Sequence, residues 1–291
     1  MKEDQQARLP DGRALGYGDY GDPAGEPVLF FHGWPSSRYQ GKLMHDFAAA
    51  RGLRLIAPDR PGIGLSDPLP GRGFSAWPQD IAALADSLGI GRFRLCGVSG
   101  GGPYTLATAA ALPDRVLAAA VICGAPPFGS PQDQANMHWA YRTLASLKRL
   151  RRAATPAVIG ASRWMIARGI DRPPMSWMMR SIPPSDRAAI ADFGCWESVT
   201  RSYLEAANSG ADAVLTDGEL YLGPWDFAPE DIRVPVAFWH GLADKNLPCD
   251  VAKRLAARVP GAVGHWIEGE GHYSLPLRYR GPVLDWLSAR M

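Results

Sequence analysis

Short apolar runs recur along the chain and alternate with longer segments in which apolar residues have helical spacing. The runs are rich in Val, Leu, Ile and Phe, as expected of strands that are buried on both faces. Strands that alternate with helices are typical of βα units and of a mainly parallel sheet. The predicted strands are Val28–Phe31, Leu53–Ala57, Phe93–Val98, Val116–Cys123, Val234–Trp239 and Ala262–Ile267.

The segments between these runs predict the helices. A parallel sheet needs crossover helices on its faces, so the expected fold class is α/β, with helices on both faces of the sheet. The segment Arg13–Tyr17 is predicted to add an antiparallel strand at one edge. The predicted helices are Tyr39–Ala50, Ser75–Leu88, Gly100–Leu112, Asp250–Arg258 and Leu277–Ala289.

Residues 126–224 interrupt this alternation because they lack clear strand-like runs and are rich in Trp, Met, Arg and Pro. We interpret this segment as an inserted helical cap, and residues 1–125 and 225–291 as the core. Most of its aromatic and Met side chains are expected to pack between helices, but binding pockets are lined mainly by such groups. We therefore predict substrate contacts from Trp139, Trp164 and Met178, and from Trp34 in the core.

The charge balance and the spacing of the cysteines limit which binding partners, metals and cofactors are expected. Lys and Arg total 31 and Asp and Glu total 29, which gives no electrostatic reason to expect nucleic acid or an anionic membrane. A neutral small molecule fits better, and oligomeric state stays open, a homo-oligomer included. The four cysteines are scattered without metal-ligand spacing, so we expect free thiols, no metal and no cofactor.

The chain contains neither a leader-like apolar segment at its start nor an apolar stretch of the roughly 18 residues needed to span a bilayer. From this pattern we expect a cytoplasmic protein without a membrane span.

The segment Gly97–Gly101 reads Gly-Val-Ser-Gly-Gly and lies between a predicted strand and a predicted helix. A G-x-S-x-G motif in this context indicates a nucleophilic serine, because a sharp strand-to-helix turn exposes the serine hydroxyl above the sheet edge. Small neighbours tolerate the strained backbone of such a turn, and the helix N-terminus offers free N–H groups to an oxyanion. Ser99 is therefore the predicted nucleophile.

A serine hydroxyl needs a base within hydrogen-bond reach, and the base needs an orienting carboxylate. His272 follows the last predicted strand on a glycine-rich loop, and Asp244 follows the strand before it. We predict His272 as base and Asp244 as orienting acid. Asp217 and Asp226 remain alternatives for the acid; His265 is the nearest rival base, but it lies inside a strand-like run.

With these motifs, nearly the whole chain outside the cap resembles the α/β-hydrolase family. The segment His32–Pro35 is similar to the family's H-G-x-P oxyanion loop, which implies that the backbone N–H groups of Trp34 and Gly100 bind the oxyanion. The segment Asp59–Asp67 resembles the family's D-x-x-G-x-G-x-S turn. Serine at position 99 argues against the haloalkane dehalogenase and epoxide hydrolase branches, whose nucleophile is aspartate.

The resulting hypothesis is a cofactor-independent carboxylic ester hydrolase that forms an acyl-enzyme on Ser99. The same triad serves thioesterases, lactonases, amidases, perhydrolases and carbon–carbon bond hydrolases, and these alternatives stay open. A small-molecule receptor on the same fold is an alternative of another class, because a fold does not fix a function.

Overall fold

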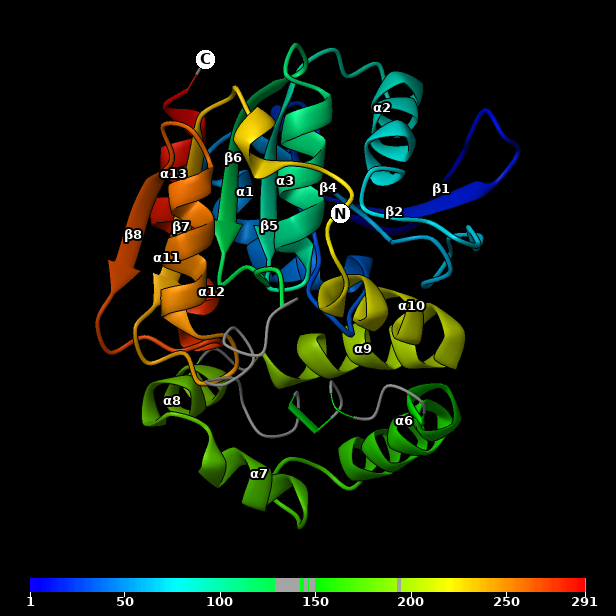
Figure 1. Ribbon diagram of the computed structural model, residues 1–291, viewed down its shortest axis with the longest axis vertical. Coiled ribbons are helices and arrows are strands. Elements are labelled where there is room, and N and C mark those ends of the chain that lie inside the picture. Colours follow the sequence, from blue (N-terminus) through cyan, green and yellow to red (C-terminus); the bar gives the residue numbers. More distant parts are fainter. Residues whose placement is uncertain (129–141, 144–145, 147–149, 193–194, 291) are drawn as a thin grey trace.

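The computed structural model describes residues 1–128, 142–143, 146, 150–192 and 195–290 (Figure 1). These residues contain one sheet of eight strands in the order β1-β2-β4-β3-β5-β6-β7-β8. The pairs β1–β2 and β2–β4 are antiparallel, and every other neighbouring pair is parallel. The strands are β1 Lys2–Arg8, β2 Ala14–Gly21, β3 Glu26–Phe31, β4 Leu53–Pro58, β5 Phe93–Val98, β6 Val116–Ile122, β7 Val236–Gly241 and β8 Val263–Ile267.

The six predicted apolar runs all form strands, and the mainly parallel α/β class is confirmed. The antiparallel edge differs from the prediction. The strand predicted over Arg13–Tyr17 is β2, but it lies second from the edge because β1 pairs with its free side. The residues Lys2–Arg8 are almost all polar and alternate between exposed and half-buried positions, so their strand has no apolar signature.

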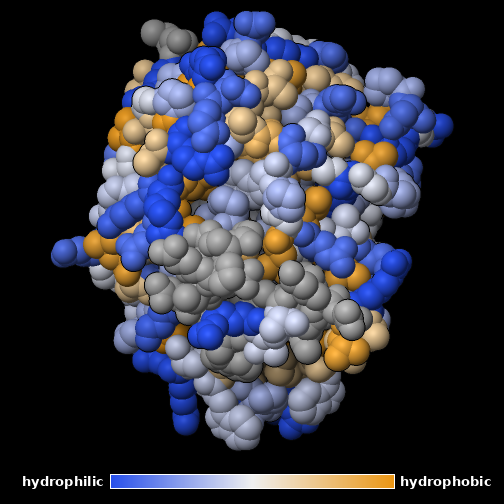
Figure 2. Space-filling model, viewed as in Figure 1, coloured by the Kyte–Doolittle hydropathy of each residue, from blue (hydrophilic) through white to orange (hydrophobic). Residues whose placement is uncertain are grey.

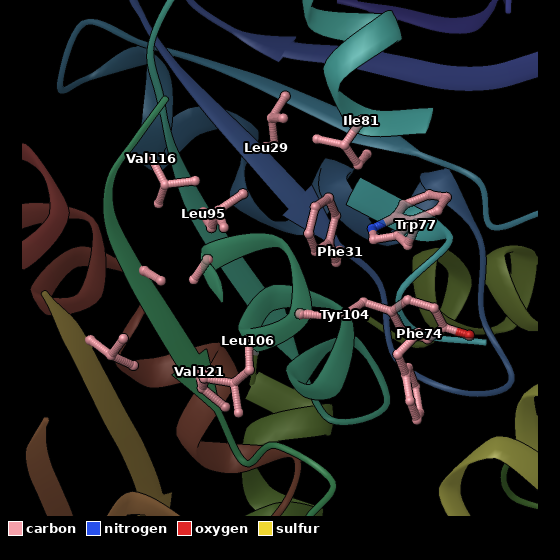
Figure 3. Packing of buried hydrophobic residues seen from close by; sticks show 14 of the residues in the cluster. Leu29, Phe31, Phe74, Trp77, Ile81, Leu95, Tyr104, Leu106, Val116 and Val121 are labelled. Carbon is pink, nitrogen blue, oxygen red and sulfur yellow. The ribbon is translucent and has the colours of Figure 1, made fainter. Parts of the chain in front are cut away.

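Helices cover both faces of the sheet in the core. Successive residues of β3 point to opposite faces, so that Leu29 and Phe31 join one buried cluster while Val28 and Phe30 join the other. Helices α2 and α3 cover the first face, where Phe31 packs edge-on against Trp77 (Figure 3). The core helices are η1 Arg38–Met44, α1 His45–Ala49, α2 Trp77–Ser87, α3 Gly101–Ala111, η2 Pro229–Asp231, α11 Cys249–Arg258, α12 Ser274–Arg278 and α13 Arg280–Ser288.

The described residues from 150 to 222 form further helices, which lie beyond the carboxyl ends of the parallel strands (Figure 1). Helix α9 packs on η1, α8 packs on α12, and α10 packs on α6 and α9. The sheet edge that carries the predicted catalytic loops therefore faces this helical layer. Its helices are α6 Arg151–Ala167, α7 Met175–Ser181, α8 Pro184–Asp192, α9 Trp196–Asn208 and α10 Ala211–Leu222.

Surface properties agree with the balanced composition. Among the described residues on the face in Figure 2, hydrophilic residues are mixed with hydrophobic ones, which lie singly or in small groups. Among the described residues, no helix is long and apolar enough to cross a bilayer. The four cysteines are free thiols, as predicted.

Candidate active site

Ser99 lies on the sharp turn between β5 and α3. Its φ of 53° is in the left-handed region that non-glycine residues rarely adopt. Its backbone N–H donates to the carbonyl of Ile122 at 2.9 Å, which anchors the turn to β6. A Cβ atom at Gly97 would overlap Thr105, and one at Gly101 would overlap the backbone of β3. The two glycines therefore allow the close packing that holds Ser99 in this conformation.

The structure brings Ser99, His272 and Asp244 together from three separate loops. His272 Nε2 lies 3.0 Å from Ser99 Oγ, and His272 Nδ1 lies 2.8 Å from Asp244 Oδ2. The other carboxylate oxygen of Asp244 accepts the backbone N–H groups of Asn246 at 2.8 Å and Leu247 at 2.9 Å. The hydrogen bonds form a continuous chain from the carboxylate through the imidazole to the hydroxyl.

Burial and neighbouring charge have opposite effects on the pKa values of His272 and Asp244. Burial alone would lower the pKa of His272, but the adjacent carboxylate of Asp244 raises it above the usual histidine value. Burial alone would raise the pKa of Asp244, but the charge and hydrogen bond of His272 lower it. The pair therefore favours an ionised Asp244 beside an imidazole that readily takes up a proton, which is what a general base requires.

The alternative acids and the rival base lie elsewhere. Asp217 on α10 binds Arg60 and Arg72, and Asp226 binds the hydroxyl of Ser75 at 2.6 Å. His265 on β8 stacks on Trp239, with ring centroids 3.8 Å apart. Among the acids considered, Asp244 is the one that contacts His272.

Trp34 and Gly100 flank the space beside Ser99. A Cβ atom built on Gly100 would lie 3.1 Å from the backbone nitrogen of Trp34, and one built on Gly33 would lie 3.5 Å from Ser99 Cβ. Within the described part of the chain, neither the Trp34 nor the Gly100 backbone N–H has a protein acceptor. Two free N–H groups next to a nucleophile are the arrangement an oxyanion hole needs.

Helix α10 contacts the loops that carry both of these N–H groups. The guanidinium of Arg60 donates to the carbonyls of His32 and Gly33 at 2.6 Å each, and its Nε donates to Asp217 at 2.6 Å. Tyr221 donates its hydroxyl to the carbonyl of Gly100 at 2.9 Å. Trp34 Nε1 also donates to the α10 backbone, at 2.8 Å. The loop of residues 32–35, predicted to bind the oxyanion, is thus held from the helical layer as well as from the sheet.

Asp217 is fully buried at the centre of that contact. Burial alone would raise the pKa of Asp217, but the guanidiniums of Arg60 and Arg72 hold it well below its usual range. Tyr104 donates a further hydrogen bond to the same carboxylate at 2.8 Å. The sequence gives no indication of this network, because its members lie far apart along the chain and the motif that contains Arg60 does not specify its partners.

Helix α8 places a second buried carboxylate, that of Asp186, against the loop of His272. It accepts the backbone N–H groups of His272, Tyr273 and Ser274 at 3.1, 2.9 and 2.7 Å. An acidic residue in the first turn of a helix is common, so the sequence alone does not single out Asp186.

One group of three potential metal donors occurs among the described residues: Cys123, Asp244 and His272, whose donor atoms lie within 4.8 Å of one another. These residues do not fit a metal ion. Asp244 and His272 are bonded to each other, and burial raises the pKa of the Cys123 thiol well above its usual value, so that the sulfur is protonated.

The predicted substrate contacts in the cap occupy varied positions. Trp139 lies outside the described residues. Trp164 is 54% exposed and Met178 is 50% exposed, so much of each side chain faces solvent. A cavity of about 430 Å³ lies between α7, α8 and α9, lined in part by Met179 and Trp196. The assignment of Trp164 and Met178 to a substrate pocket stays a prediction.

A family comparison agrees with the fold. The model of the α/β-hydrolase fold family matches residues 26–173 of this chain. The chain belongs to this family. A thermophilic esterase from Thermogutta terrifontis has the same fold, with a TM-score of 0.71 over 98% of both chains at 22% sequence identity.

Curated relatives add similarity over part of the chain. A non-heme chloroperoxidase from Streptomyces lividans is 37% identical over 119 residues, which cover 40% of this chain and 43% of that protein. A bifunctional esterase/perhydrolase from Acinetobacter calcoaceticus is 34% identical over 120 residues, with 40% and 43% covered. In both cases, the chain matches less than half of the relative's length.

Proposed function

We propose that the protein is a serine hydrolase that cleaves carboxylic esters through an acyl-enzyme on Ser99. The observation that carries the proposal is the hydrogen-bond chain from Asp244 through His272 to the hydroxyl of Ser99. Beside it lie the backbone N–H groups of Trp34 and Gly100, which have no acceptor among the described residues. This arrangement supplies a nucleophile, its base, the acid that orients the base, and an oxyanion site.

In the first half-reaction, Ser99 Oγ attacks the ester carbonyl while His272 Nε2 accepts the hydroxyl proton. The carbonyl oxygen becomes an oxyanion and accepts hydrogen bonds from the backbone N–H groups of Trp34 and Gly100. When the intermediate collapses, the C–O bond to the alcohol breaks, and His272 returns the proton to the leaving oxygen. Ser99 then carries the acyl group.

In the second half-reaction, a water molecule gives a proton to His272 Nε2 and attacks the acyl carbonyl. The second intermediate releases the carboxylic acid and restores the hydroxyl of Ser99. Asp244 stays ionised throughout and stabilises the imidazolium, as its lowered pKa favours.

Perhydrolysis is the second candidate, because the relatives include a protein named for peroxidase activity and one named for esterase and perhydrolase activity. In that reaction hydrogen peroxide takes the place of water, and the products are a peracid and free Ser99. The triad is common to both reactions, so the preferred acceptor has to be measured.

The test is a hydrolysis screen over esters of different acyl length, thioesters, lactones and amides, repeated with hydrogen peroxide as acceptor. Ester turnover should exceed turnover of the other classes, and Ser99→Ala should reduce it by roughly 10⁴-fold or more. Wild-type turnover by Ser99→Ala would rule out the nucleophile, and faster peracid formation than ester hydrolysis would favour the perhydrolase.

A further inference from the structure

The loop that carries His272 is wrapped around a side chain from the helical layer. The carboxylate of Asp186 on α8 is 1% exposed, and it accepts the N–H groups of three consecutive residues beginning with His272. Three short hydrogen bonds to one carboxylate fix the direction of this backbone segment. The imidazole of His272 projects from the first of these residues.

The rest of the loop is shaped to admit this carboxylate. A Cβ atom at Gly271 would lie 2.5 Å from both carboxylate oxygens of Asp186, so that only glycine leaves the required space. The N–H group of Gly271 turns instead to the hydroxyl of Ser274, at 2.7 Å. Gly269, with a φ of 75°, adds a turn that other residues adopt with strain. A loop of this composition needs an external anchor to hold one conformation.

We propose that Asp186 is a positioning residue, through which the helical layer holds the His272 loop so that the imidazole reaches both Ser99 and Asp244. This inference rests on the proposed function for the role of His272, but its geometry is independent of the substrate. Helix α8 also packs on α12 through Ile190 and Leu277, so that the anchor belongs to a rigid contact.

The charge of Asp186 has a second consequence at the same place. The titratable groups that face His272 are Asp244, Asp186, His240, the thiol of Cys123 and Tyr273, whose ring packs edge-on against the imidazole. Burial lowers the pKa of His272, and Asp244 raises it most, with a smaller contribution in the same direction from Asp186. Without that negative charge, the imidazolium formed during catalysis is less stable, so the pKa of His272 falls and the imidazolium loses its proton at lower pH.

The experiment compares Asp186→Asn with the wild type and with Asp212→Asn. The control makes the same substitution on an exposed carboxylate of α10, whose side chain is 84% accessible. Thermal unfolding establishes that each variant is folded. The pKa of His272 is then measured by NMR in protein labelled with [¹³C]histidine, with the resonance assigned through His272→Asn, and kcat and KM are measured across pH with an aryl ester.

Asp186→Asn should lower kcat by roughly tenfold to a hundredfold, the cost of misplacing a reacting group by a fraction of an ångström to 1 Å, with KM little changed. The acid limb of kcat/KM and the NMR pKa of His272 should both move to lower pH. Asp212→Asn should match the wild type. A folded Asp186→Asn with wild-type kcat, or with an unmoved His272 pKa, overturns the proposal.

Gly271→Ala provides a second variant in case Asp186→Asn does not fold. The added methyl displaces the carboxylate of Asp186 while its charge remains, so kcat should fall and the acid limb should move less than in Asp186→Asn. Wild-type turnover in Gly271→Ala overturns the positioning role. If the wild type hydrolyses no ester, the proposed function fails, but the NMR pKa of His272 in the variants still decides whether Asp186 acts on it.

Discussion

The two sides of the candidate site are built in different ways. On the sheet side, Ser99, Asp244 and His272 come from loops that directly follow β5, β7 and β8. On the opposite side, Asp186 and Asp217 come from helices and reach the site through buried ionic hydrogen bonds.

The two sides therefore have different proposed roles: the sheet side carries out the reaction, and the helical side holds the loops in place. In the proposed mechanism, the sheet edge supplies the groups that exchange protons and form bonds, and its strands are mutually hydrogen-bonded. The helical layer supplies carboxylates that hold the backbone of those loops. Substitutions on the sheet side should therefore abolish turnover while leaving the fold stable, whereas substitutions on the helical side should affect stability and turnover together.

The largest expected effect belongs to Asp244→Asn. The amide cannot orient and stabilise the imidazolium as a carboxylate does, so kcat should fall by about 10⁴-fold. Turnover of a short-chain ester is the measurement, with circular dichroism to show that the fold is retained. A loss of less than tenfold would mean that another acid orients His272.

The next effect is on stability, in Asp217→Asn. The substitution leaves the buried guanidiniums of Arg60 and Arg72 without their anion, and breaking such a buried pair costs about 3–5 kcal/mol. The free energy of unfolding in urea is the measurement, and Asp212→Asn is the surface control. A change within about 0.5 kcal/mol, the range of ordinary surface substitutions, would refute the proposed support from α10.

The smallest effect is expected from Tyr221→Phe. This substitution removes the hydrogen bond to the carbonyl of Gly100 but keeps the ring that packs edge-on against Trp34. Stability should fall by about 1 kcal/mol and turnover by less than about tenfold. A hundredfold loss of kcat in a stable variant would show that Tyr221 takes part in the chemistry, and the separation between the two sides would fail.

Local patterns predicted the core of the fold because buried parallel strands are continuous apolar runs. They failed at β1, whose residues are almost all polar and which joins the sheet at its edge by pairing with β2. Within the site, the sequence shows the glycines around Ser99 and the strand ends before Asp244 and His272. These features could be predicted because a loop that directly follows a strand lies at the end of that strand in the fold.

The supports could not be predicted in this way. Asp186 lies 86 residues from His272, and Asp217 lies 157 residues from Arg60. The sequence around an aspartate does not show which distant groups its carboxylate will bind. From the sequence, Asp217 is only an alternative acid for the histidine. Both roles depend on how the helices of residues 150–222 lie over the sheet, which is a property of tertiary packing.

The central claim is that Ser99 is a nucleophile activated by His272, and covalent labelling tests it most directly. A fluorophosphonate should add one equivalent to the wild-type protein, detected as a single mass shift and located on Ser99 by peptide mass spectrometry. Ser99→Ala should remain unlabelled, and His272→Asn should react far more slowly. A wild-type protein that takes up no label, or a Ser99→Ala variant labelled to the same extent, would contradict the account.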